Sequence, residues 1–173
     1  MSRPLLPLCS SQALFIPALA NYLPDHVFDN VPSLVSPYGA LNVGAFLAYV
    51  PATLRMIMSK GGYNNVSPRA QVEKLSKSSP LFARLHGAHM NTLESWPFFA
   101  TGVIAARSAG VDSDKVSRMV TSWCAIRALY ILVYMAQRGS IAVAGLRSLC
   151  FLASFTVSCR LLILAAKEDG DSS

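Results

Sequence analysis

The sequence is poor in charged residues. Asp, Glu, Lys and Arg make up 14% of its 173 residues, whereas 53% are hydrophobic. A soluble domain typically carries about 25% charged residues, so the composition argues against one. The net charge of +6 does not come from the Lys/Arg runs of nucleic-acid-binding segments, because the basic residues are scattered. We therefore expect an integral membrane protein that contacts lipid and does not bind nucleic acid.

Cysteine motifs are also lacking. The four cysteines show no CxxC pairing, and three of them lie in apolar segments: Cys9, Cys124, Cys150 and Cys159. Buried thiols usually behave as small hydrophobic side chains. We expect neither a metal site nor a disulfide.

Proline, in contrast, is abundant near the start. Six prolines fall within residues 1–37, and proline interrupts the hydrogen bonding of a helix interior. Residues 1–37 are therefore predicted to form an irregular or interfacial segment.

Four apolar segments follow, over residues 38–58 and about 81–106, 115–137 and 140–166. Each is long enough to cross a bilayer, which takes roughly 20 apolar residues. A polar loop is predicted over 59–80 and a polar, acidic tail over 167–173. Because the later links are short, neighbouring spans should run antiparallel. The sequence predicts an all-α, up-and-down four-helix bundle in the membrane.

The loop charges predict an orientation. The first loop carries Lys60, Arg69, Lys74 and Lys77 against the single acid Glu73, and the last link adds Arg138. Positive loops favour the cytosolic side. Both termini are therefore expected on the non-cytosolic side.

Polar residues recur on one face of each of the last three predicted helices, at about 100° per residue. Ionisable groups inside hydrocarbon are costly unless they are paired or hydrated, so the three faces should converge on a shared polar interior. The faces comprise Arg84, Asn91, Glu94 and Ser95, then Trp123, Arg127, Tyr130, Tyr134 and Arg138, and finally Arg147, Phe151, Ser154 and Ser158.

Structural roles remain open for several of these residues. Glu94 either pairs with an arginine, such as Arg147, to fix helix register or serves a ligand. Asn91 is either a hydrogen-bonding contact between helices or a ligand contact. Tyr130 and Tyr134 are either interfacial anchors or part of a site.

The order of these residues resembles the MAPEG family, the membrane-associated proteins of eicosanoid and glutathione metabolism. The resemblance covers about residues 38–166 and rests on the residues that follow, in the expected helices: Arg84, His89, Asn91, Glu94 and Pro97, then Arg127, Tyr130 and Tyr134, and then "LRSL" around Arg147. It implies a four-helix bundle, usually a homotrimer, with glutathione bound between neighbouring subunits near the cytosolic face. If the source is a eukaryote, the endoplasmic reticulum or another intracellular membrane is expected.

The resemblance also implies roles for individual residues. Arg147, followed by Ser148, matches the catalytic arginine that stabilises the glutathione thiolate, and glutathione would be a co-substrate. The implied glutathione-binding residues are Arg55, Arg84, Asn91, Glu94, Arg127, Tyr130 and Tyr134. Two positions depart from the family pattern: Gly87 stands where the well-studied glutathione-using members carry an arginine, and Phe151 where the prostaglandin-forming member has a tyrosine.

The predicted function is a membrane-bound, glutathione-dependent transferase or peroxidase that acts on lipophilic electrophiles. The alternative is a non-catalytic trimeric membrane protein of the same fold, whose polar seam specifies assembly or binds a lipid headgroup.

Overall fold

The computed structural model describes residues 20, 24–59, 64 and 66–171. Within these residues the chain forms helices and turns and no strand. A 3-10 helix, η1 (Asp25–Phe28), precedes five α-helices, which confirms the all-α prediction. They are α2 (Gly39–Met58), α3 (Pro68–Ser78), α4 (Pro80–Ser108), α5 (Ser113–Ala136) and α6 (Ile141–Asp171).

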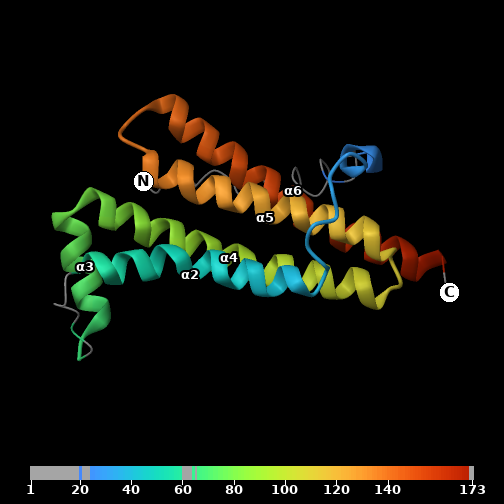
Figure 1. Ribbon diagram of the computed structural model, residues 1–173, viewed down its shortest axis with the longest axis horizontal. Helices are drawn as coiled ribbons and strands as arrows, with labels where there is room; N and C mark the ends of the chain where they lie inside the picture. The colour runs from blue at the N-terminus through green and yellow to red at the C-terminus, as the bar shows by residue number, and fades with distance from the viewer. Residues whose placement is uncertain (1–19, 21–23, 60–63, 65, 172–173) are drawn as a thin grey trace, which may run out of the picture.

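The four long helices lie side by side, with the short α3 at one end (Figure 1). Helix α4 is the common neighbour, because it packs against α2, α3, α5 and α6. Helix α3 and the α5–α6 link lie at one end of the molecule, and the α4–α5 link and the C-terminus lie at the other (Figure 1). This arrangement puts the two predicted cytosolic segments at the same end.

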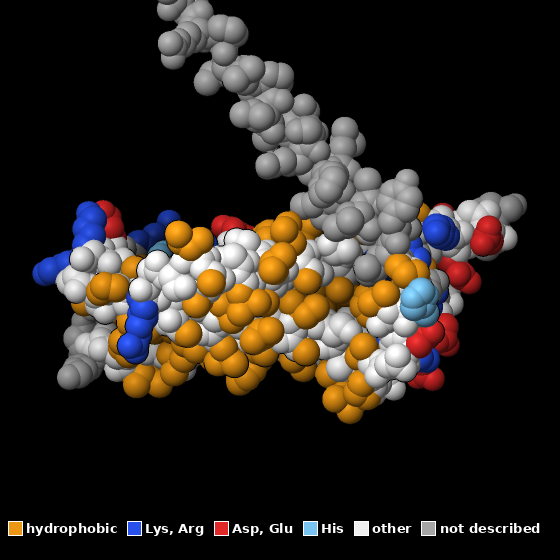
Figure 2. Space-filling view, turned by 90° about the horizontal axis from the view of Figure 1, so that it is seen from above, with side chains coloured by type: hydrophobic (Ala, Val, Ile, Leu, Met, Phe, Trp, Pro, Cys, Tyr) orange, Lys and Arg blue, Asp and Glu red, His pale blue; other side chains and the backbone are white. Residues whose placement is uncertain are grey.

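Three helices, α2, α5 and α6, are long and apolar enough to cross a membrane. Helix α4 has the length, with 29 residues, but is not among them. Its first half carries Arg84, His86 and Glu94, which dilute its apolar character. On the face shown in Figure 2, hydrophobic side chains cover the middle of the molecule and charged ones gather at its two ends.

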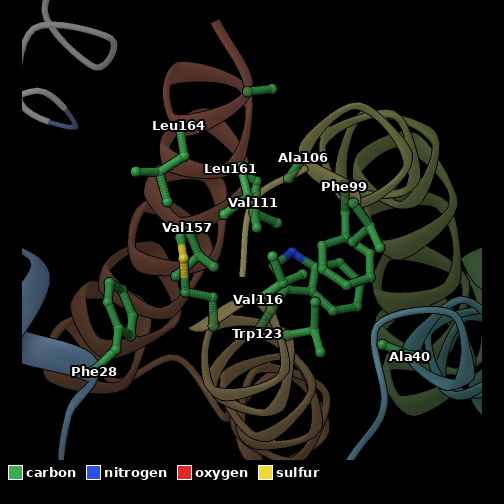
Figure 3. Packing of buried hydrophobic residues seen from close by; sticks show 14 of the residues in the cluster. Phe28, Ala40, Phe99, Ala106, Val111, Val116, Trp123, Val157, Leu161 and Leu164 are labelled. Carbon is green, nitrogen blue, oxygen red and sulfur yellow. The ribbon is translucent and has the colours of Figure 1, made fainter. Parts of the chain in front are cut away.

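The largest core cluster joins α2, α4, α5, α6 and η1. Its centre is a stacked pair, Phe99 of α4 and Trp123 of α5, with ring centroids 3.8 Å apart (Figure 3). Helices α4 and α6 approach closely at Gly102, where a Cβ atom would lie 3.1 Å from the Ser158 carbonyl oxygen. Small residues permit such close packing between membrane helices.

The α4–α5 link is a Schellman turn. Gly110 has a φ of +89°, and the amide of Val111 donates to the Ala106 carbonyl oxygen at 3.0 Å. Glycine adopts this left-handed conformation without steric cost. Asp112 then caps α5 by accepting from the Lys115 amide at 2.8 Å. The tight link fixes α5 antiparallel to α4.

Two segments outside the predicted spans contain helix. The loop predicted over 59–80 contains α3, which begins at Pro68, a favourable first helical residue. The acidic tail is helical up to Asp171, so α6 is longer than the predicted span. Part of the lead segment is also ordered against the helices: Phe28 is buried in the core, and the Val35 amide donates to Thr121 Oγ1 at 3.2 Å. The earlier part, residues 1–19 and 21–23, lies outside the described residues.

Candidate functional site

A cavity of about 360 Å³ opens between α4, α5 and α6. It brings together five of the predicted site residues, one from α4, two from α5 and two from α6. Phe151 and Leu152 complete the lining with apolar surface. The five predicted residues are Asn91, Tyr130, Tyr134, Arg147 and Ser148.

Arg147 is the cationic side chain of this cavity. Its Nη1 donates to Gln137 Oε1 at 2.7 Å, and its Cζ lies 4.8 Å from the centroid of the Tyr134 ring. Gln137 follows directly after α5, so the end of one helix orients a side chain of the next. The neighbouring Ser148 is exposed, and its hydroxyl donates to the Ala144 carbonyl oxygen at 3.2 Å.

Tyr134 lines the cavity, and the hydroxyl end of its ring lies against α4 at Gly87. A Cβ atom at position 87 would lie 2.9 Å from Tyr134 Cζ and closer still to the hydroxyl oxygen. On the same turn, Asn91 Nδ2 donates to the Gly87 carbonyl oxygen at 2.9 Å. The space of a side chain at 87 is therefore filled by the tyrosine.

Arg84 lies in an adjoining cavity of about 390 Å³, which shares Tyr134 and Arg147 with the first. Its Nε donates to the Met135 carbonyl oxygen at 3.2 Å. This carbonyl belongs to the last turn of α5, where helical carbonyls lack partners within the helix. The two cavities together carry two guanidinium groups, Arg84 and Arg147.

Arg127 does not line either of these cavities, because it is completely buried. Its Cζ lies 5.1 Å from the ring centroid of Tyr130, 5.3 Å from that of Phe151 and 5.6 Å from that of Trp123. The structure thus places this predicted ligand contact behind the aromatic wall of the cavity.

Arg55 lies on the other side of α4, in a separate cavity of about 610 Å³ beneath α3. Its Nη1 is 2.5 Å from Nδ1 of His86, which also lines this cavity, as does His89. His89 Nδ1 donates to the Ala48 carbonyl oxygen at 2.7 Å, since a carbonyl can only accept. Within one chain, Arg55 and Arg147 therefore face different cavities.

Glu94 is exposed on α4 and forms no ion pair with any residue that the structure describes. The predicted pairing with Arg147 is therefore not formed within the described chain, where Arg147 contacts Gln137 instead.

Sequence reasoning assigned no site role to Gln137, His86 or Leu152, although each of them lines one of these cavities. Leu152 follows Phe151 and carries no chemical signal. His86 lies off the polar face of its helix. Gln137 lies just beyond α5, in the short link to α6, and this position could have predicted that it contacts a residue of α6.

The fold and cavity define a class: a helical membrane protein whose long helices enclose a hollow lined by arginine, tyrosine and apolar side chains. The MAPEG family profile matches residues 38–167, which is most of the chain. The chain belongs to the MAPEG family. No curated protein and no solved structure matches it.

Proposed function

We propose that this protein is a membrane-bound, glutathione-dependent transferase or peroxidase that acts on lipophilic electrophiles. The observation that carries the proposal is the position of Arg147, half-buried at a cavity that is lined by both polar and apolar side chains. MAPEG members commonly use glutathione, and the resemblance assigns Arg147 to the family's catalytic arginine.

The chemistry of the lining supports this assignment. The thiolate is the reactive form of glutathione, and a neighbouring guanidinium stabilises it. Arg147 supplies that charge, and Ser148 and Tyr134 line the same cavity and carry hydroxyl groups. Leu152 and Phe151 offer apolar surface on which a lipophilic electrophile can lie. Arg147 and Ser148 are the proposed catalytic residues.

Glutathione is anionic, so its carboxylates require donors. Arg84 in the adjoining cavity has the fork geometry that suits a carboxylate, and Asn91 offers an amide. Tyr130 and Tyr134 complete the proposed contacts.

Assembly completes the proposed site. We infer a homotrimer of four-helix bundles, in which α4 also crosses the membrane and glutathione binds between neighbouring subunits. The cavity that holds Arg55 supports this inference, because it lies on the face of α4 opposite to the Arg147 cavity. The exposed Glu94 is then available to a neighbouring subunit or to the ligand. The apolar side chains Phe46, Tyr49 and Leu54, exposed on α2, provide contact surface for lipid or for another subunit.

A second candidate is a non-catalytic protein of the same fold that binds a lipid headgroup or uses its polar seam only for assembly. The contact between Tyr134 and Gly87 favours it, because this tyrosine occupies the place of a family arginine that would bind glutathione.

Isothermal titration separates the two candidates. Detergent-purified protein is titrated with glutathione at millimolar concentration and with a non-reactive S-alkyl analogue. Saturable heat with both ligands supports the enzyme. If neither ligand produces heat, the enzyme proposal is rejected in favour of the non-catalytic protein.

A further inference from the structure

Helix α3 runs across the end of the bundle, whereas the four long helices lie side by side (Figure 1). Helix α2, which is long and apolar enough to cross a membrane, has 20 residues and ends at Met58. At 1.5 Å per residue it is about 30 Å long, which is the thickness of the hydrocarbon core of a bilayer. Because Arg55 of α2 and Val72 of α3 line the same cavity, the end of α2 lies beside α3. When α2 spans the bilayer, α3 therefore lies among the lipid headgroups.

The charges at this end of the molecule are mostly positive. Its exposed charged residues are Arg69, Lys74 and Lys77 of α3 and Arg138 of the α5–α6 link, against the acid Glu73. On the face shown in Figure 2, Lys and Arg gather at this end. At the opposite end, exposed acids offset the basic residues: Asp112, Asp114, Glu168, Asp169 and Asp171. The end that carries α3 is thus the basic end of the molecule.

The lysines of α3 are not used by the packing of the bundle. Val72 and Leu75 are half-buried, whereas Lys74 and Lys77 are exposed. Among the described residues, Lys74 forms no ion pair, and Lys77 pairs with Glu73 at 2.7 Å. Such an exposed pair contributes little to stability, so an external anion can replace it at low cost. Neither lysine lines the three cavities described above. Both ammonium groups are therefore available to a ligand from outside the bundle.

Apolar side chains are exposed next to this basic helix. In the last turn of α2, Met56 is 53% exposed and Ile57 is 67% exposed. In a membrane span such side chains contact the acyl chains of lipids. A phospholipid beside α2 would thus have its acyl chains on this apolar surface and its headgroup at the level of α3. Basic residues at that level attract anionic lipids in preference to zwitterionic ones.

We propose that Arg69, Lys74 and Lys77 of α3 form a docking surface for an anionic phospholipid of the adjoining leaflet. The three cationic side chains bind the headgroup oxygens by charge-assisted hydrogen bonds. The predicted orientation agrees with this assignment, since the cytosolic leaflet is the one that holds anionic lipids. The surface is separate from the Arg147 cavity and does not depend on the use of glutathione.

Native mass spectrometry of the full chain in neutral detergent measures this selectivity. The protein is incubated with phosphatidylserine or with phosphatidylcholine of the same acyl chains, and the lipid-bound fraction gives an apparent affinity for each. Because each basic residue near a headgroup contributes about fivefold, Lys74→Gln/Lys77→Gln should weaken phosphatidylserine binding about tenfold to thirtyfold. Phosphatidylcholine binding should stay unchanged. An undiminished preference for phosphatidylserine would overturn the proposal.

Two further variants distinguish a local surface from net charge and from damage to α3. Lys115→Gln/Lys167→Gln removes the same two charges from the opposite end and should keep the wild-type preference. Glu73→Gln removes the acid that pairs with Lys77 and should strengthen phosphatidylserine binding about fivefold. Equal losses in the two double variants would contradict a local surface, and so would weaker binding by Glu73→Gln.

Inorganic phosphate tests whether the ligand is a lipid or a free anion. At equal ionic strength, phosphate and chloride should reduce phosphatidylserine binding equally, because a free ion lacks the acyl chains that hold a headgroup at this surface. Displacement by phosphate alone would indicate a site for soluble anions and would overturn the lipid assignment. None of these measurements involves glutathione. Loss of the lipid preference therefore leaves the proposed function standing, and the absence of glutathione binding leaves the lipid surface standing.

Discussion

Gly87 and Tyr134 occupy each other's space: a Cβ atom on the glycine would lie 2.9 Å from the tyrosine Cζ. The glycine is therefore required for the observed position of the tyrosine. Tyr134 in turn lies 4.8 Å beneath the Arg147 guanidinium, measured from its ring centroid to Cζ. One missing side chain on α4 thus sets the position of the aromatic ring that supports the proposed catalytic cation.

This relationship predicts the effect of restoring the family arginine. Gly87→Arg should displace Tyr134 and add a guanidinium, which tightens glutathione binding about tenfold to a hundredfold. Gly87→Ala is the control, because it displaces Tyr134 without adding charge and should weaken binding. Titration calorimetry measures both. Equal affinities for the two variants would show that the position does not contact the ligand.

Arg147→Ala should separate chemistry from binding. If the guanidinium stabilises the thiolate, its loss should lower the turnover number about a hundredfold to a thousandfold while the glutathione affinity stays nearly unchanged. Arg147→Lys should recover part of the rate, because the charge survives although the fork does not. The ultraviolet absorbance of the bound thiolate should fall in parallel.

The exposed arginine Arg138, which lies in the same α5–α6 link as Gln137, provides the control. Arg138→Ala should retain the wild-type rate. A stable, glutathione-binding Arg147→Ala protein with undiminished turnover would rule out the catalytic role. A poorly folded Arg147→Ala protein that Glu94→Ala rescues would instead indicate that the two residues pair in the assembled protein.

Arg127→Met should stabilise the ligand-free protein, because the Nε, Nη1 and Nη2 atoms of Arg127 have no hydrogen-bond partner among the described residues. Replacement of an unpaired buried cation by an apolar side chain of similar length removes a desolvation cost, and such changes are often neutral or stabilising by about 1–4 kcal/mol. A higher melting temperature in detergent is the expected result. Arg160→Met is the comparison, because Arg160 is also buried but Nη1 donates to the Ala20 carbonyl oxygen. That variant should melt at a lower temperature. A lower melting temperature for Arg127→Met as well would contradict the prediction that its buried charge destabilises the protein.

The topology is tested by labelling single cysteines at Ser67 and Glu168 after the native cysteines are replaced. These exposed positions lie at opposite ends of the molecule, next to α3 and near the end of α6 (Figure 1). The positive loop charges predict that only Ser67→Cys reacts from the cytosolic side. Labelling of both positions from the same side of sealed vesicles would contradict this orientation.

The sequence alone determined the helical class and the family, because both depend on patterns of residues within single segments. Apolar segments of bilayer length give long helices, and Gly110 with Asp112 ends one helix and starts the next. The polar faces of α4, α5 and α6 could also be predicted from helical periodicity, and Asn91, Tyr130 and Arg147 from these faces line the same cavity. Helix α3 was missed because its short amphipathic pattern lies among Gly, Ser and Asn residues.

Only the tertiary structure decided what each polar side chain contacts. Periodicity puts Arg127 on the same face as Tyr130, but it does not show that three rings close over the guanidinium. Likewise, the sequence shows only that Gly87 lacks the family arginine. The structure shows that Tyr134 fills the space of that side chain. The physical reason is that a helical face is fixed by backbone geometry within one segment. The partner of a side chain depends instead on how far and at what rotation a second helix packs against it, and local sequence does not encode that distance.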